Sequence, residues 1–428
     1  MVARALGLCS ERGMADTLGV YRYTRKVDRS PSPAATPDHP AGEQVGDAFT
    51  RDAPTWLSYA ALGCFTFWLY AFGPALTLLR EELRFSYSVL GAYELCWSAG
   101  AAAAGAGFAR ASRRLARGTL LWTSALGVTA GAGVFVLGRS VPATLAGAAV
   151  FGAAGTMLLA VVQAVLSARH GSRRDRALTE ANIGAGAASV FAPLALGALA
   201  GSVLGWRATF AVPAVALLVL YLRYRHLPLP PPVQHGNASR SGPLPLACWL
   251  FTVLTALSSA IEFCLVYFGP QVLIGIGLSA GAAGTALSAN FLGILLGRVL
   301  GARLTRRPGR STALLCASLG LTLVSVVLFW LSRQPTLAVV ALFSSGVGIA
   351  NLYPLALSLT LEAADGREDE ANARSQLVLG VLAGIFPYLL GTLADRHGLT
   401  TGFALEPALI ILCFFLLWGG VRTRRHHR

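Results

Sequence analysis

Apolar segments of about twenty residues alternate with short, arginine-rich polar segments along most of the chain. Each apolar segment is near the roughly 20 residues that a helix needs to cross a bilayer. The predicted spans cover residues 56–79, 88–109, 118–138, 143–168, 177–201, 206–225, 246–270, 279–302, 311–331, 335–360, 373–394 and 399–421. The longest break between them is rich in proline and divides the twelve spans six and six. The pattern predicts an all-α integral membrane protein with 12 transmembrane helices in two pseudo-symmetric six-helix bundles.

The remaining segments are polar and define the predicted domain boundaries. Residues 1–54 contain clustered prolines and lack a signal-peptide core, which predicts a disordered cytoplasmic tail. Met1 and Met14 are both candidate first residues. The N-terminal bundle is expected at 55–226, a cytoplasmic linker at 227–245, the C-terminal bundle at 246–421 and a basic cytoplasmic tail at 422–428.

Arginines predict the orientation of the spans. Loops after even-numbered spans, together with the C-terminal tail, hold 21 arginines, whereas loops after odd-numbered spans hold 6. Positively charged loops stay on the cytoplasmic side. We therefore expect a multi-pass protein of the cell membrane with both termini in the cytoplasm.

Composition supports the membrane class and changes how the high charge is interpreted. The chain is 54% hydrophobic and only 13% charged, which is more apolar surface than a soluble fold can bury. Its formal net charge of +15 would suit nucleic acid. Because the arginines cluster between apolar spans, we attribute the charge to orientation and to contact with the lipid bilayer, and expect no nucleic-acid partner.

The two halves of the chain repeat at an offset of 194 residues without a gap over four spans. In alanine- and glycine-rich helices a single match is uninformative, but one register held over four helices indicates a duplicated six-helix unit. The matched pairs include Gly107 with Gly301, Arg113 with Arg307, Gly152 with Gly346, Pro193 with Pro387 and Gly197 with Gly391.

A basic turn at Gly297–Arg310, GRVLGARLTRRPGR, carries a resemblance to a known family. With the six-plus-six spans and the tripeptide GWR at 205–207, it makes residues 56–421 resemble the major facilitator superfamily of transporters. The family's loop pattern, GxxLxDRxGR, is matched at Gly301, Leu304, Arg307, Gly309 and Arg310, but Arg306 stands in place of the aspartate. The resemblance implies two bundles that rock about a central site.

Within the superfamily, the second half is similar to the fucose–proton symporter branch. Gly297-Arg298 and Tyr353-Pro354 carry this likeness. Tyr70 and Leu158 stand where that branch has acidic residues, so fucose is not transferred as the substrate.

Two carboxylates inside predicted spans are the candidates for proton coupling, because a charge in hydrocarbon is costly and usually functional. The resemblance implies that the first, fourth, seventh and tenth spans line the cavity, which would put Glu262 beside the substrate path. The alternative for Glu262 is a structural hydrogen bond. Glu94, in the second span, is expected to pair with Arg80 or Arg84 at the rim, in a functional or a structural role.

Gating is predicted for the basic turn and for one pair related by the repeat. Arg298 would either extend to the bilayer surface or lock the halves by pairing with Glu362 or Asp365. Glu180 and Arg374 occupy equivalent positions and are either gate groups or interfacial charges. The full set of gating candidates is Gly297, Arg298, Gly301, Arg307, Arg310, Glu180 and Arg374.

Uncharged candidates for substrate binding lie where the cavity is expected. Aromatic faces and amides suit a neutral polyol or a small amphiphile, although an aromatic residue in a membrane helix is more often a packing residue. The absence of an arginine at mid-depth argues against a carboxylate or phosphate substrate. The candidates are Trp68, Tyr70, Gln163, Tyr267, Asn290, Asn351 and Tyr353.

These features predict a proton-coupled symporter for a small-molecule substrate that works by alternating access. No GxxxxGK[ST] motif is present, and we expect no cofactor, metal or enzymatic activity. A monomer is expected. The alternatives are proton-coupled efflux of small hydrophobic compounds and a membrane sensor that keeps the fold. A membrane enzyme would need clustered acids or histidines, which are scattered here.

Overall fold

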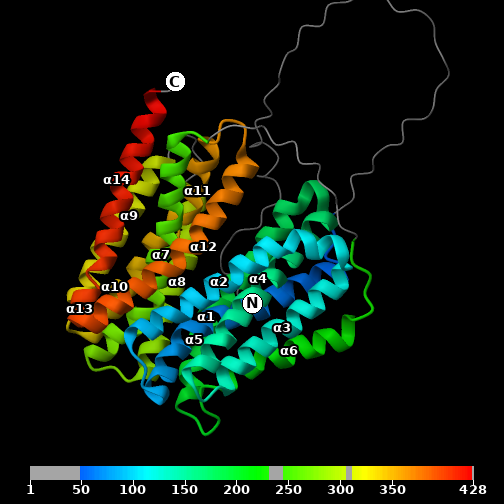
Figure 1. Ribbon diagram of the computed structural model, residues 1–428, viewed down its shortest axis with the longest axis horizontal. Coiled ribbons are helices and arrows are strands. Elements are labelled where there is room, and N and C mark those ends of the chain that lie inside the picture. Colours follow the sequence, from blue (N-terminus) through cyan, green and yellow to red (C-terminus); the bar gives the residue numbers. More distant parts are fainter. Residues whose placement is uncertain (1–48, 231–243, 305–310, 427–428) are drawn as a thin grey trace, which may run out of the picture. The chain divides into compact units, whose positions relative to one another are not determined.

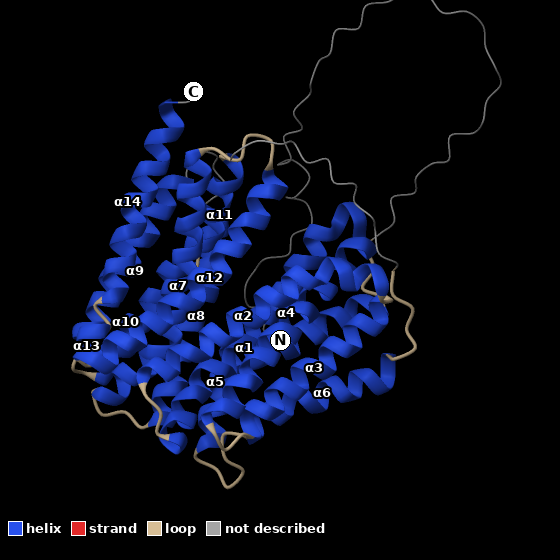
Figure 2. Cartoon of the chain, in the orientation of Figure 1, coloured by secondary structure: helices blue, strands red, loops and turns tan. Residues whose placement is uncertain are grey.

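The computed structural model describes residues 49–230, 244–304 and 311–426, and within these ranges the chain is helical and contains no β-strand (Figure 2). The N-terminal half comprises α1 (Ala53–Leu83), α2 (Tyr87–Arg114), α3 (Arg117–Leu137), α4 (Val141–His170), the short 3-10 helix η2 (Gly171–Arg173), α5 (Arg174–Ala200) and α6 (Ala208–Tyr224). The C-terminal half comprises α7 (Leu246–Gly275), α8 (Ala280–Leu304), α9 (Ser311–Leu331), α10 (Pro335–Ile349), α11 (Leu352–Glu362), α12 (Glu368–His397), α13 (Leu399–Gly402) and α14 (Leu405–His426).

Helices occupy all twelve predicted ranges, with two differences in detail. The tenth span is divided into α10 and α11, and the twelfth begins with the short helix α13. Among the described residues, ten helices are long and apolar enough to cross a membrane. The other two are α6, which has 17 residues, and α2, whose apolar run is interrupted by Glu94 and by glycines.

Helix bounds follow the 194-residue repeat. Helices α3 and α9 start and end at equivalent positions, and α5 and α12 start at equivalent positions. Figure 1 shows the two halves as two groups of neighbouring helices, coloured blue to green and green to red. The structure therefore supports the duplicated unit that the sequence predicts.

Two predicted boundaries differ from the structure. Residues 49–52, assigned to the tail by the sequence, contact α4 and α5 through hydrogen bonds, and Asp52 caps α1 by accepting from the backbone N–H of Thr55 at 3.2 Å. At the other end, α14 continues through the predicted basic tail to His426.

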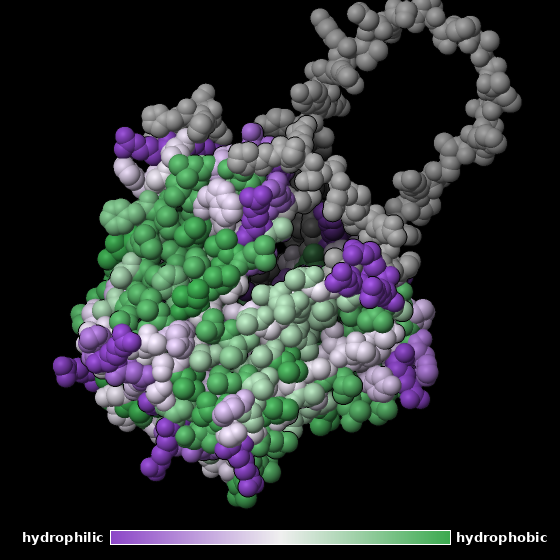
Figure 3. Space-filling model, in the orientation of Figure 1, coloured by the Kyte–Doolittle hydropathy of each residue, from purple (hydrophilic) through white to green (hydrophobic). Residues whose placement is uncertain are grey.

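Apolar side chains cover the middle of the molecule, and hydrophilic residues gather at its two ends (Figure 3). The outward faces of α6 and α14 are examples, since Val215, Leu222, Phe415 and Trp418 are exposed. Such an apolar band flanked by polar ends is the surface that a bilayer covers. The chain is a multi-pass membrane protein.

The halves meet where α2 packs on α12, α5 on α8, and α1 on α7 and α8. We name the two ends of the molecule by the loops of the first three helices. The α1–α2 end is where α1 ends and α2 begins, and the α2–α3 end is where α2 ends and α3 begins. Toward the α2–α3 end the two groups of helices diverge (Figure 1), and the space-filling view shows a hollow there (Figure 3).

Candidate functional site

At the α1–α2 end, side chains from both halves close the space between α1 and α7. Arg80 of α1 donates from Nη1 to Oε1 of Gln271 on α7 at 3.1 Å, and its guanidinium lies 4.0 Å from the ring centre of Tyr87. Gln271 in turn donates to Thr77 Oγ1 at 3.3 Å. These contacts join the halves at this end.

Close backbone packing between α2 and α12 completes the closure. Asp395 of α12 accepts from the backbone N–H groups of Tyr87 and Ser88 at 2.8 Å each, which places a carboxylate at the N-terminus of α2, where the helix dipole favours it. A Cβ on Gly91 would collide with the backbone of Pro387, and one on Gly391 with the backbone of Tyr87. Only glycine permits this approach.

A cavity of about 210 Å³ lies between the halves. It lies beyond these contacts, toward the α2–α3 end. Helices α1, α4 and α5 contribute one wall and α8 the other. Most lining side chains are apolar, three of them are aromatic, and one, Arg298, is charged. They are Leu62, Phe65, Thr66, Leu69, Tyr70, Leu159, Asn182, Ala185, Gly186, Ser189, Phe291, Ile294, Leu295 and Arg298.

Two predicted residues, Tyr70 and Arg298, line this cavity. The Tyr70 ring meets the Phe291 ring edge-to-face, with 4.7 Å between centroids. Arg298 is exposed and makes no hydrogen bond or ion pair with any residue that the structure describes. Glu262 is half-buried on α7, which packs on α8, and does not line this cavity. Arg298 of α8 is thus the charged residue in the lining of this cavity.

Glu94 does not pair with Arg80 or Arg84 as the sequence suggested. Its carboxylate is buried and accepts from Tyr267 Oη at 2.6 Å and from Ser98 Oγ at 2.9 Å. Tyr267 lies on α7, so this hydrogen bond joins α2 of one half to α7 of the other. Tyr267 is thus bound to Glu94 and does not face the cavity as a free phenol.

Two predicted substrate residues point into helix packing instead. Trp68 is 1% exposed and donates from Nε1 to the carbonyl of Phe210 at 2.9 Å, inside the N-terminal bundle. Asn290 is fully buried and donates to the Leu342 carbonyl and to Ser345 Oγ, both at 3.0 Å. Trp68 Nε1 and Asn290 Nδ2 are engaged in structural contacts, whereas Asn290 Oδ1 is buried without a hydrogen-bond partner among the described residues. Neither residue lines the cavity.

Asn351 and the α8 glycines form a structural joint. Asn351, at the break between α10 and α11, donates to the carbonyl of Gly297 at 2.9 Å, and its amide occupies the space that a Cβ on Gly301 would need. Asn351 therefore holds α8 against the break and is not a cavity residue.

The last two substrate candidates lie nearer the α2–α3 end. Gln163 is exposed one helical turn beyond Leu159, a cavity residue, on the same face of α4. Tyr353 accepts a hydrogen bond from Gln376 of α12 at 2.9 Å.

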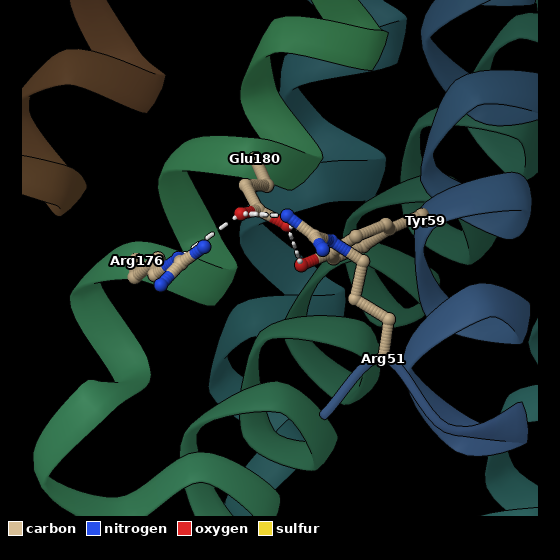
Figure 4. A network of polar contacts seen from close by, with 4 residues as sticks. All are labelled: Arg51, Tyr59, Arg176 and Glu180. Carbon is tan, nitrogen blue, oxygen red and sulfur yellow. Dashed lines mark hydrogen bonds and ion pairs between the residues drawn. The ribbon is translucent and has the colours of Figure 1, made fainter. Parts of the chain in front are cut away.

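Figure 4 shows the contacts of Glu180, which lie within the N-terminal half. Arg51, just before α1, donates to both carboxylate oxygens of Glu180, at 2.7 and 2.8 Å. Tyr59 and Arg176 donate to the same carboxylate at 3.2 Å each. The hydrogen bonds to Glu180 raise the pKa of Arg51. In this conformation Glu180 fastens the segment before α1 to α5.

Arg374, the repeat equivalent of Glu180, also pairs within its own half. It contacts Glu370 at 2.6 Å and lies 5.6 Å from the ring centre of Trp249. Glu370 is itself the repeat equivalent of Arg176, so the two i,i+4 pairs occupy the same place with opposite polarity.

The predicted lock of Arg298 with Glu362 is absent, because Glu362 pairs with Arg424 at 2.7 Å. Arg307 and Arg310 lie outside the described residues.

Sequence reasoning missed two carboxylates, one that is fully buried and one that is held by hydrogen bonds. Glu406 of α14 is fully buried, and neither of its carboxylate oxygens has a hydrogen-bond partner among the described residues. Glu82 accepts from Trp206 Nε1 at 2.7 Å and from Arg207 Nη1 at 2.8 Å, which anchors the GWR segment to α1. The rule that found Glu262, an ionisable residue inside a predicted span, applies equally to Glu406.

A family model described as the Major Facilitator Superfamily matches residues 56–364 and 249–428. No curated protein matches the chain by sequence.

Several solved transporter structures share the fold. One is a bacterial homologue of the human lysosomal transporter Spinster, in an inward-facing and unoccupied conformation, with a TM-score of 0.68, 15% identity and coverage of 87% of this chain and 96% of that chain. The nucleoside transporter NupG matches with a TM-score of 0.67, 15% identity and coverage of 86% and 98%. The peptide transporter POT in complex with sulfate matches with a TM-score of 0.68, 16% identity and coverage of 87% and 95%. At these identities the likeness is one of fold.

Proposed function

The chain belongs to the major facilitator superfamily and is a membrane transporter, and on that premise we propose that it moves a small organic solute by proton-coupled alternating access. The observation that carries this proposal is the asymmetry of the interface between the halves. At the α1–α2 end, hydrogen bonds and glycine-mediated packing join them. Toward the α2–α3 end they enclose a cavity. A site reached from one end only is what alternating access requires.

Arginine distribution makes the α2–α3 end the cytoplasmic one, so the conformation described is inward-facing in this proposal. Both termini are then cytoplasmic, the membrane is the cell membrane, and a monomer suffices, because one chain contains both halves of the cavity. The likeness to the fucose–proton symporter branch remains a prediction.

The cavity favours a small amphiphile with an anionic group. Its volume of about 210 Å³ is below the roughly 300–1,000 Å³ of drug-sized sites. Tyr70 and Phe291 offer aromatic faces for an apolar body, and Arg298 offers a planar guanidinium that binds a carboxylate with two hydrogen bonds. Gln163, at the approach to the cavity, adds an amide. This site revises the preference for a neutral polyol that the sequence alone gave.

Glu262 supplies the coupling in this scheme. In this proposal an anion that approaches Arg298 of α8 is repelled by an ionised Glu262 on α7, the helix that packs against α8. A proton on Glu262 removes that repulsion, so proton and anion bind together. Glu94 is the second candidate, because its carboxylate joins the halves at the closed end and loses Tyr267 when that end opens.

Transport by purified protein in proteoliposomes tests this function. With an imposed pH gradient, proton movement is recorded for short aromatic monocarboxylates, neutral sugars and hydrophobic cations. We expect a monocarboxylate to carry protons inward with native protein. Glu262→Gln should retain counterflow exchange but lose accumulation driven by the pH gradient.

Glu81→Gln is the matched control, since Glu81 is exposed at the end of α1 and should leave transport unchanged. Equal behaviour of Glu262→Gln and native protein would refute the coupling role. Proton-coupled movement of hydrophobic cations in the outward direction would favour the efflux alternative, and absence of any transported compound would favour a sensor.

A further inference from the structure

A second cavity, of about 430 Å³, lies within the N-terminal half at the α2–α3 end, away from the cavity between the halves. It forms where α2 ends, α3 begins, α4 ends and the η2–α5 segment starts. None of the residues assigned to transport lines it. The lining residues are Phe108, Ser112, Arg117, Leu120, Val161, Ala164, Ser167, Ala168, Gly171 and Arg174.

The polar side of this cavity is suited to an anion. Arg117 lines it, and its Nη1 atom is buried without a hydrogen-bond partner among the described residues. Arg117 is also the first residue of α3, and Ala116 before it provides no side-chain cap. A cation at the positive end of a helix dipole, beside uncapped backbone N–H groups, is unfavourable unless an anion lies between them.

The other side of the cavity is apolar. Phe108, Leu120, Val161 and Ala164 lie deeper along α2, α3 and α4, whereas Ser167 and Arg174 lie nearer the helix ends. The lining therefore changes from hydrocarbon to cationic and hydroxyl groups along the direction in which a bilayer changes from acyl chains to headgroups. An inorganic anion would use only half of this surface.

We propose that this cavity binds a phospholipid with an anionic headgroup, with the phosphate at Arg117 and the start of the acyl chains against Phe108 and Leu120. Arg117 donates charge-assisted hydrogen bonds to the phosphate oxygens, and the first N–H groups of α3 add to them. Arg174 and the hydroxyl of Ser167 line the same rim.

The internal repeat indicates that the site is specific to the first half. The repeat equivalent of Arg117 is Ser311, and that of Arg174 is Glu368. The second half thus carries neither cation at the corresponding place. One strongly bound anionic lipid per chain is the expected stoichiometry from this cavity.

The test measures lipid retention by the full chain. Protein purified in a neutral detergent is titrated with phosphatidylglycerol, with phosphatidylcholine of the same acyl chains, and with inorganic phosphate, and followed by native mass spectrometry and thermal unfolding. We expect one phosphatidylglycerol to be retained and to raise the unfolding temperature, and Arg117→Gln to weaken its apparent affinity roughly tenfold or more.

Arg113→Gln is the matched control, because Arg113 is an exposed arginine in the last turn of α2, at the same end of the molecule, and does not line the cavity. Ala164→Leu tests the apolar side without changing charge, and it should lower retention by filling the space that the acyl chains need. Equal losses in Arg113→Gln and Arg117→Gln would refute the site in favour of general surface attraction. Phosphate that competes as well as the lipid would show a free-anion site, and equal retention of phosphatidylcholine would also overturn the proposal.

Discussion

The hydrogen bond between Tyr267 and Glu94 should set how readily the α1–α2 end opens. The two residues belong to different halves and are both buried, with 2.6 Å between Tyr267 Oη and Glu94 Oε2. If the halves separate at this end, the bond is lost. Tyr267→Phe removes the hydroxyl and keeps the ring, so the closed end should lose stability relative to the open one.

The magnitude follows from the burial of the carboxylate. Deleting one partner of a buried hydrogen bond leaves the other unsatisfied, at a cost of about 1–3 kcal/mol. At a tenfold change per 1.4 kcal/mol, the ratio of closed to open molecules should fall about 5- to 150-fold. Ser98→Ala is the matched control, since Ser98 donates to the same carboxylate from within α2 and its bond does not depend on the halves meeting.

The populations can be measured as distances between spin labels at Glu81 in the first half and Thr336 in the second, both exposed near the α1–α2 end. We expect Tyr267→Phe to increase the long-distance population and Ser98→Ala to leave it near the native value. Equal shifts in both variants, or none in Tyr267→Phe, would refute the view that this bond holds the halves together.

Two further predictions concern packing and pH. Gly91→Val should open the α1–α2 end or lower the unfolding temperature, because its Cβ has no space against the backbone of Pro387, at a cost of about 1–3 kcal/mol. A Cβ at Gly105, on the same helix, has no other atom within 4 Å, so Gly105→Val should be neutral. Similar label distances and unfolding temperatures for the two variants would contradict the argument. Burial raises the pKa of Asp52, but hydrogen bonds from Thr55 and Arg169 outweigh burial and hold this pKa below the ordinary 3.8. The ionised Asp52 therefore stabilises the fold above pH 3.8, and this contribution is lost as the pH falls through the pKa of the folded state. Asp52→Ala should therefore lower the free energy of unfolding at pH 7 by about 0.5–2 kcal/mol, the usual cost of a lost helix cap, and the difference should shrink at acid pH; a constant difference across the pH series would contradict this.

The sequence predicts which segments are helices better than which way their side chains point. Long apolar runs are readily recognised, so helices occupy all twelve predicted ranges, although the sequence did not predict the division of the tenth span into α10 and α11. Rotation of a helix about its axis is set by packing with helices distant in sequence, and this separates Tyr70, which faces the cavity, from Trp68, which binds Phe210 inside the bundle. Asn290 was misassigned for the same reason.

The pairs Arg176–Glu180 and Glu370–Arg374 occupy equivalent places with opposite polarity, and this arrangement bears on the history of the chain. If both halves descend from one ancestral unit, reversing such a pair took two substitutions. Either substitution alone leaves two like charges one helical turn apart, which is destabilising. Each half keeps an oppositely charged pair at this place, although the sign of each member is reversed between the halves. Sequence comparison scores these two positions as mismatches, although both halves carry an ion pair there.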